Sequence, residues 1–176
     1  MTQKEFEDRL DSNLYQVFLF SAPLPYPLNF AVHGWFVINL NGRIHRWDFG
    51  RFIDSPHPNK IGVLKDFIPF TTGLRKFPWN TKYVTESKLH GYISGPLDSR
   101  AEKMARFIEN ETPNYPLRDT YKLIGPNSNT YVKWVINHFS DCGFKLPWNA
   151  FGRNCKEAES NYLTKVTEPL NSSSSG

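Results

Sequence analysis

Cysteine is scarce in this 176-residue chain, and so are runs of charge of one sign. Its two cysteines, Cys142 and Cys155, are too few for a disulfide framework and lack the spacing of a zinc site. Lys and Arg never form a run of five, and the net charge of +4 is spread along the chain, so nothing indicates nucleic-acid binding. We expect no metal, no cofactor and no nucleic-acid partner.

Long hydrophobic segments are absent as well. The longest apolar run, LNFAVHGWFVINL (28–40), is too short to cross a bilayer and contains a histidine. The first ten residues, MTQKEFEDRL, have no apolar core of a signal peptide. We therefore expect a soluble protein, with the cytoplasm as the favoured location. The sequence leaves open the oligomeric state and whether the partner is a small molecule or a peptide.

Aromatic residues, by contrast, are abundant, with 14 Phe, 8 Tyr and 5 Trp. The length suits one domain with one substantial core, and we place that domain at residues 1–160. The polar end of the chain, 161–176, finishes in NSSSSG and is predicted to be disordered.

Hydrophobic periodicity predicts an α+β fold, in which a small antiparallel sheet packs against helices on one side. Asn41-Gly42 is a strong hairpin signal between two of the strands. Residues 53–96 read mainly as loops with one or two short strands. The predicted strands cover 14–20, 29–40 and 43–52, and the predicted helices cover 2–10, 98–110 and 129–139.

The last of these helices opens with four consecutive polar residues, Asn127 to Thr130, behind Gly125-Pro126. Its buried face is predicted by apolar residues at i, i+3, i+4 and i+7, beginning at Val132. Ser128 lies four residues before Val132, so a helix extended back to it places the hydroxyl on that face. Unpaired N–H groups there favour a developing anion, as a nucleophile needs. The alternative is that the four residues only compete to cap the helix.

A candidate base lies on the strand that precedes the hairpin. Alternation predicts that the even positions from Phe30 to Leu40 face the core, whereas His33 shares the other face with Trp35. A helix covering that face would bring its N-terminus to the histidine. The other interpretation is a half-buried histidine bonded to a backbone carbonyl.

The hairpin loop decides whether His45 joins His33. A two-residue Asn41-Gly42 loop pairs Ile38 with His45 and sends this histidine to the opposite face. A three-residue loop with a bulge pairs Val37 with His45, so that both histidines share a face. Both loops are compatible with the sequence. We favour the bulged loop because it also moves Trp47 opposite Trp35.

Three motifs together resemble an uncharacterised, mainly bacterial family of unknown function. They are H-G-W at 33–35, G-P-N-S-N-T-Y at 125–131 and L-P-W-N-A-F-G-R-N at 146–154. The resemblance runs from about residue 14 to residue 154.

This family in turn resembles circularly permuted papain-like proteins, which include the NlpC-type and lecithin:retinol acyltransferase groups and permuted desumoylating peptidases. In those proteins a histidine on a strand precedes a cysteine nucleophile at a helix N-terminus. The resemblance implies Ser128 as nucleophile, His33 as base and His45 as a second histidine. Because serine replaces cysteine, the site needs a base and an oxyanion hole. Asn127, Asn129 or the Ser128 N–H would supply the oxyanion donors, and Asp48 is the nearest acid able to orient a histidine.

Two functions follow from this interpretation, and a third does not depend on it. One is a hydrolase or acyltransferase that uses Ser128. Another is a catalytically inactive binding protein for a lipid, peptide or glycan, with Trp35 among the residues lining its pocket. The third is a partner-binding surface formed by RWDFGRF (46–52) and FPWN (77–80).

Overall fold

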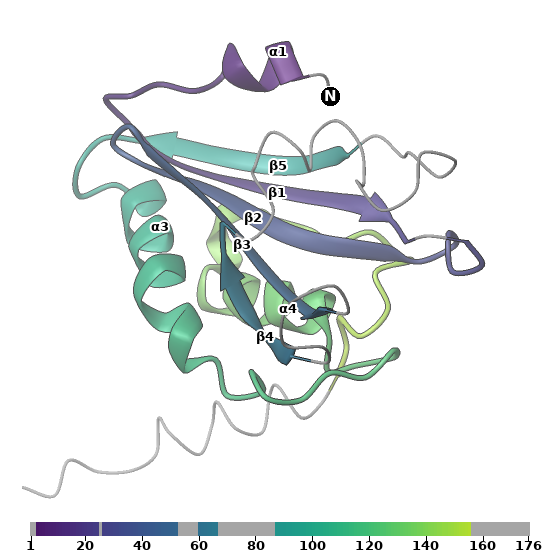
Figure 1. Ribbon diagram of the computed structural model, residues 1–176. Coiled ribbons are helices and arrows are strands. Elements are labelled where there is room, and N and C mark those ends of the chain that lie inside the picture. The colour runs from purple at the N-terminus through teal and green to yellow at the C-terminus, as the bar shows by residue number, and fades with distance from the viewer. Residues whose placement is uncertain (1–2, 25, 53–59, 67–86, 156–176) are drawn as a thin grey trace, which may run out of the picture.

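A computed structural model describes residues 3–24, 26–52, 60–66 and 87–155, which contain a five-stranded antiparallel sheet with helices (Figure 1). The strand order is β4-β3-β2-β1-β5, so the strands nearest the N-terminus occupy the centre of the sheet. The expected α+β class is confirmed at this level. The strands are β1 (Tyr15–Pro23), β2 (Val32–Leu40), β3 (Arg43–Phe52), β4 (Lys60–Lys65) and β5 (Lys88–Gly95).

Helices lie on both faces of the sheet rather than on one (Figure 1). The short α1 (Gln3–Glu7) covers one face, where Phe6 packs edge-on against the rings of Phe18 and Phe20. The longer α3 (Arg100–Glu111) and α4 (Ser128–His138) pack against the other face. Short 3₁₀ turns follow each of the longer helices, namely η1 (Thr112–Asn114) and η2 (Ser140–Cys142).

Because both faces are covered, β2 is apolar and buried on both. Phe36, Ile38 and Leu40 face α3 and α4, as the alternation predicted, while Trp35 and Val37 belong to the cluster under α1. Phe30 is an exception to the prediction, because the strand begins only at Val32 and leaves Phe30 exposed in the preceding loop.

The hairpin between β2 and β3 has the two-residue loop, so the favoured bulged loop is wrong. Leu40 pairs with Arg43 and Ile38 pairs with His45. Both loop residues have positive φ, 54° at Asn41 and 94° at Gly42, which a type I′ turn requires. Asparagine tolerates this conformation, so Leu40 need not enter the loop.

Both long helices begin at polar caps that the sequence indicated. Ser99 caps α3 by accepting a hydrogen bond from the N–H of Glu102, while α4 begins at Ser128, in line with the extended helix considered above. In the 53–96 stretch, β4 and β5 account for the short strands that were expected. The predicted tail at 161–176 lies outside the described residues.

Candidate functional site

The start of α4 is held by a capping box centred on Asn127. Its Oδ1 accepts hydrogen bonds from the backbone N–H groups of Asn129 (3.0 Å) and Thr130 (3.3 Å). In return, the Thr130 hydroxyl oxygen accepts from the Asn127 N–H, and Asn127 Nδ2 donates to the carbonyl of Leu123. The Asn127 side chain therefore fixes both the helix and the loop that enters it.

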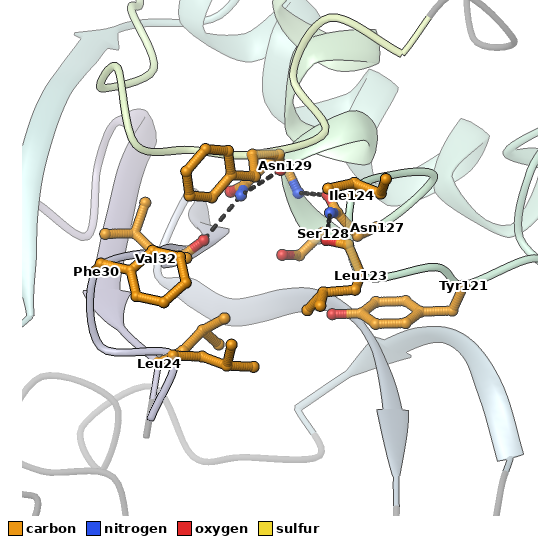
Figure 2. A pocket seen from close by; sticks show the side chains of 12 residues that line it. Leu24, Phe30, Val32, Tyr121, Leu123, Ile124, Asn127, Ser128 and Asn129 are labelled. Atoms are coloured by element: carbon orange, nitrogen blue, oxygen red, sulfur yellow. Dashed lines mark hydrogen bonds between the residues drawn. The ribbon is translucent and has the colours of Figure 1, made fainter. Parts of the chain in front are cut away.

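Asn129 joins the helix to two other segments. Its Nδ2 donates to the carbonyl oxygens of Val32 (2.8 Å) and Phe151 (2.9 Å), which commits both N–H groups (Figure 2). Its Oδ1 packs on Gly34, where an added Cβ would lie 3.0 Å away. Glycine at this position lets the helix approach the strand closely. The geometry thus assigns Asn129 a clamping role and leaves its amide no N–H for the predicted oxyanion hole.

Ser128 is 2% exposed and lines a pocket of about 200 Å³ at the start of α4. Figure 2 shows Leu24 and Phe30 on one side and Tyr121 and Leu123 on the other, with Ser128 between them. Most of the wall is apolar. The lining residues are Leu24, Leu28, Phe30, Ala31, Val32, Tyr121, Leu123, Ile124, Asn127, Ser128, Asn129 and Phe151.

Tyr121 is the polar neighbour of Ser128 in this pocket. Burial raises the pKa of Tyr121, and hydrogen bonding with the Ser128 side chain opposes that rise only in part. The phenol is therefore neutral at pH 7 and is no base. Among the described residues that line the pocket there is no His, Asp, Glu, Cys, Lys or Arg. In this part of the chain, nothing at the pocket accepts a proton from Ser128 readily.

The structure does not bring His33 to Ser128. Val32 and Gly34 face the start of α4, so His33 between them points to the other face of the sheet. There its Nε2 lies 2.8 Å from Oδ1 of Asp48. The prediction that a helix N-terminus covers the face of His33 is therefore wrong for α4. Gly34 explains why α4 covers the opposite face of β2, because the missing side chain leaves the space that the start of the helix occupies.

His33 belongs instead to a buried polar cluster, formed with Trp35, Arg46 and Asp48. Arg46 donates from Nε to Oδ2 of Asp48, and its Cζ lies 4.2 Å from the centroid of the Trp35 ring. Burial alone would raise the pKa of Asp48, but the charge of Arg46 and the hydrogen bond with His33 outweigh it and hold the pKa at about 2. Trp35, expected to contact a ligand, packs here and does not line the pocket.

His45 lies apart from both places. Its register with Ile38 puts it on the opposite face from His33, and its Nδ1 contacts Oδ2 of Asp66 at 2.7 Å. The predicted pairing of Trp47 with Trp35 is likewise wrong, because Trp47 pairs with Phe36.

The partner surface predicted from RWDFGRF is also not an exposed one. Residues 46–50 of this stretch are buried within β3. The FPWN stretch at 77–80 lies outside the described residues.

Most residues of the pocket wall were not predicted from the sequence. Its apolar side chains come from the 24–31 loop, the 121–126 loop and Phe151, which are distant in sequence and share no motif. A hint was available in the proline-rich SAPLPYPL (21–28), where Leu24 and Leu28 follow the end of β1 at Pro23.

No group of three or more metal-binding side chains occurs in the described ranges. In the same residues, no helix has the length and apolar character needed to cross a bilayer. Comparison with curated proteins finds no match, and comparison with solved structures finds none either. Residues 14–155 match the model of a family described as "Protein of unknown function (DUF3750)". Since this match covers most of the chain, the expectation of an uncharacterised family is confirmed, and the protein belongs to the DUF3750 family.

Proposed function

We propose that this protein is a binding protein that holds an apolar group of its ligand in the pocket at the start of α4. The observation that carries the proposal is the pocket wall, which is mostly apolar and has the Ser128 hydroxyl and the Tyr121 phenol as polar contacts. Pockets of this kind bind ligands mainly by apolar contact and orient them with a few polar groups. Among the ligands considered from the sequence, a lipid or an apolar peptide side chain fits this wall better than a glycan.

The size of the pocket limits what enters it. Apolar cavities of roughly 150 Å³ hold benzene, and pockets for drug-sized ligands begin at roughly 300 Å³. A volume of about 200 Å³ lies between these and suits one apolar group. The remainder of a larger ligand would stay outside the pocket.

The alternative is a hydrolase or acyltransferase that uses Ser128 on a permuted papain-like fold. In its favour, Ser128 lies at the start of a helix that packs on an antiparallel sheet. Against it, serine needs a general base, and His33 faces the other side of the sheet. A relationship to papain-like proteins stays a prediction, and the binding function is the better supported of the two.

Primary alcohols of increasing length should bind in the pocket. We expect the affinity to rise about three- to fourfold per methylene until the chain fills the pocket, and then to level off. Ser128→Ala should lower the affinity for each alcohol about fivefold, because one hydrogen bond is lost. Titrations followed by ¹H–¹⁵N NMR measure both effects.

A blocking variant and a matched control locate the bound alcohol. Leu28→Trp narrows the pocket and should abolish the length dependence. Leu97→Trp makes the same replacement beyond Gly95, at the opposite end of the sheet, and should leave it unchanged. Equal affinities in wild type and Leu28→Trp would show that the alcohol binds elsewhere and would contradict the proposal.

The two functions differ in how Ser128 reacts. We expect a fluorophosphonate probe to leave the folded protein unlabelled at pH 7, because the described pocket supplies no base to Ser128. Mass spectrometry of the intact protein measures the labelling. Stoichiometric labelling that disappears in Ser128→Ala would overturn the binding interpretation in favour of the hydrolase.

A further inference from the structure

Five exposed apolar side chains surround or adjoin the mouth of the pocket. Ile124 is 79% exposed and Trp148 is 78% exposed, although both are large. Single exposed apolar residues are ordinary on a protein surface, but a group of them around a pocket indicates a docking surface. We call this group the apolar rim, formed by Phe30, Leu123, Ile124, Trp148 and Phe151.

Hydrogen bonds hold the three segments of the apolar rim together. Asn149, next to Trp148, donates from Nδ2 to the carbonyl of Phe30 at 3.1 Å and accepts from the N–H of Val32. The rings of Phe30 and Phe151 meet edge to face, with centroids 6.0 Å apart. Asn129 ties the helix start to both of the other segments. The apolar rim is therefore a fixed feature of the fold rather than a set of independent loops.

The chain segments that carry the apolar rim contain charges of one sign. The described residues in 24–33, 121–129 and 144–155 include three lysines or arginines and no aspartate or glutamate. Two of these cations, Lys145 and Arg153, join Lys133 around a hollow of about 250 Å³, where no described lining residue is acidic. We call it the basic hollow. It adjoins the apolar rim because Arg153 and Phe151 belong to the same turn.

We infer that the apolar rim and the basic hollow dock this protein on an anionic lipid bilayer, so that an apolar lipid chain can enter the pocket. The inference rests on the proposed binding function. Charge complementarity favours this partner, because an anionic bilayer offers apolar chains directly below a layer of phosphates. Aromatic and aliphatic side chains enter the interface, while nearby lysines and arginines attract the headgroups. Such docking requires no membrane-spanning helix.

Co-sedimentation of the full chain with vesicles tests this inference. Vesicles of phosphatidylcholine mixed equally with phosphatidylglycerol should bind the protein at least about tenfold more strongly than phosphatidylcholine alone. Added salt should weaken this binding. Ile124→Glu removes an inserted side chain and should reduce vesicle binding about tenfold or more. The double variant Lys133→Glu, Lys145→Glu reverses two charges and should reduce vesicle binding by a similar factor.

Matched variants at the other end of the sheet are the controls. Leu97→Glu changes an aliphatic side chain of 63% exposure, as the match for Ile124 at 79%, and Arg43→Glu with Lys103→Glu reverses two exposed charges. Both should bind like wild type. Equal loss in these controls, or equal binding to both kinds of vesicle, would overturn the inference.

Comparison with the alcohol titrations separates the two proposals. Alcohol binding without vesicle binding would overturn the membrane inference, leave the pocket proposal intact and favour a peptide partner. Vesicle binding that follows the expected charge dependence, in a protein that binds no alcohol, would overturn the pocket proposal and the entry of a lipid chain, and keep only surface docking.

Discussion

Replacing Asp48 by asparagine is expected to lower the free energy of unfolding by about 3–5 kcal/mol, because the buried Arg46 would lose its counter-charge. Arg46 is 1% exposed and Asp48 2% exposed, so water cannot compensate the charge that remains. Arg46 Nη1 already has no hydrogen-bond partner among the described residues. Asparagine matches aspartate in size, so the loss would report charge and not packing. Urea unfolding at pH 7 measures it.

Asp141→Asn is the matched control for this experiment. Asp141 also pairs with an arginine, Arg100, but both side chains are exposed to solvent. Exposed ion pairs contribute little because water and salt screen them, so we expect almost no change in unfolding. If Asp48→Asn had the same free energy of unfolding as Asp141→Asn, the buried ion pair of Arg46 and Asp48 would not contribute to stability as its geometry implies.

The pH dependence of unfolding gives a second readout for Asp48. Its pKa in the folded protein is about 2, below the ordinary 3.8, so the charged form is stabilised by folding. This contribution is fully present above about pH 4 and is lost as the pH falls towards 2. A depression of nearly two units corresponds to about 2 kcal/mol. As the pH falls from about 4 to about 2, the free energy of unfolding of the wild type should decrease by this amount. That of Asp48→Asn should lack this decrease.

The sheet was largely predictable because its signals are local. Apolar runs identified β1 and β2, and Asn41-Gly42 placed β3 as the returning strand of a hairpin with β2. The choice between a two- and a three-residue loop was not predictable in the same way, because one residue of register separates them. That single residue decides which face His45 occupies.

The start of α4 was predictable for a similar reason. The polar residues from Asn127 to Thr130 cap the helix, and the apolar period that follows placed Ser128 on the buried side. The face of β2 that the helix covers was not predictable, because both faces of this strand are apolar. The deciding feature is Gly34, whose missing side chain can be understood only once the helix is seen against it.

The pocket could not be predicted from any one segment. Its wall combines loops that the chain brings together through hydrogen bonds of Asn129 and Asn149 to backbone carbonyls. Sequence patterns report periodic elements and short-range caps, whereas these contacts link residues that are far apart in the chain. Asn127 and Asn129, which were expected to supply oxyanion donors, hold these loops in place through their side-chain N–H groups.

Gly152 packs against the cap of α4, and we expect its replacement to have the second large effect on the free energy of unfolding. Gly152 has a φ of +88°, and a Cβ added there would lie 2.6 Å from Asn127 Nδ2, closer than atoms can approach. Its carbonyl oxygen also accepts a hydrogen bond from the Thr130 hydroxyl at 2.8 Å. Gly152→Ala should therefore strain the backbone and displace the helix cap, at a cost of about 2–3 kcal/mol in the free energy of unfolding.

Gly143→Ala separates backbone strain from the displaced cap. Gly143 also has a positive φ, +73°, but an added Cβ would meet nothing within 4 Å. The free energy of unfolding of this variant should fall by only about 1 kcal/mol, and its affinity for alcohols should equal that of wild type. Gly152→Ala should in addition bind alcohols more weakly, because Asn127 positions the first turn of α4 and hence Ser128. Equal losses of stability in the two variants, with unchanged alcohol binding in both, would show that contact between Gly152 and the cap does not maintain the pocket.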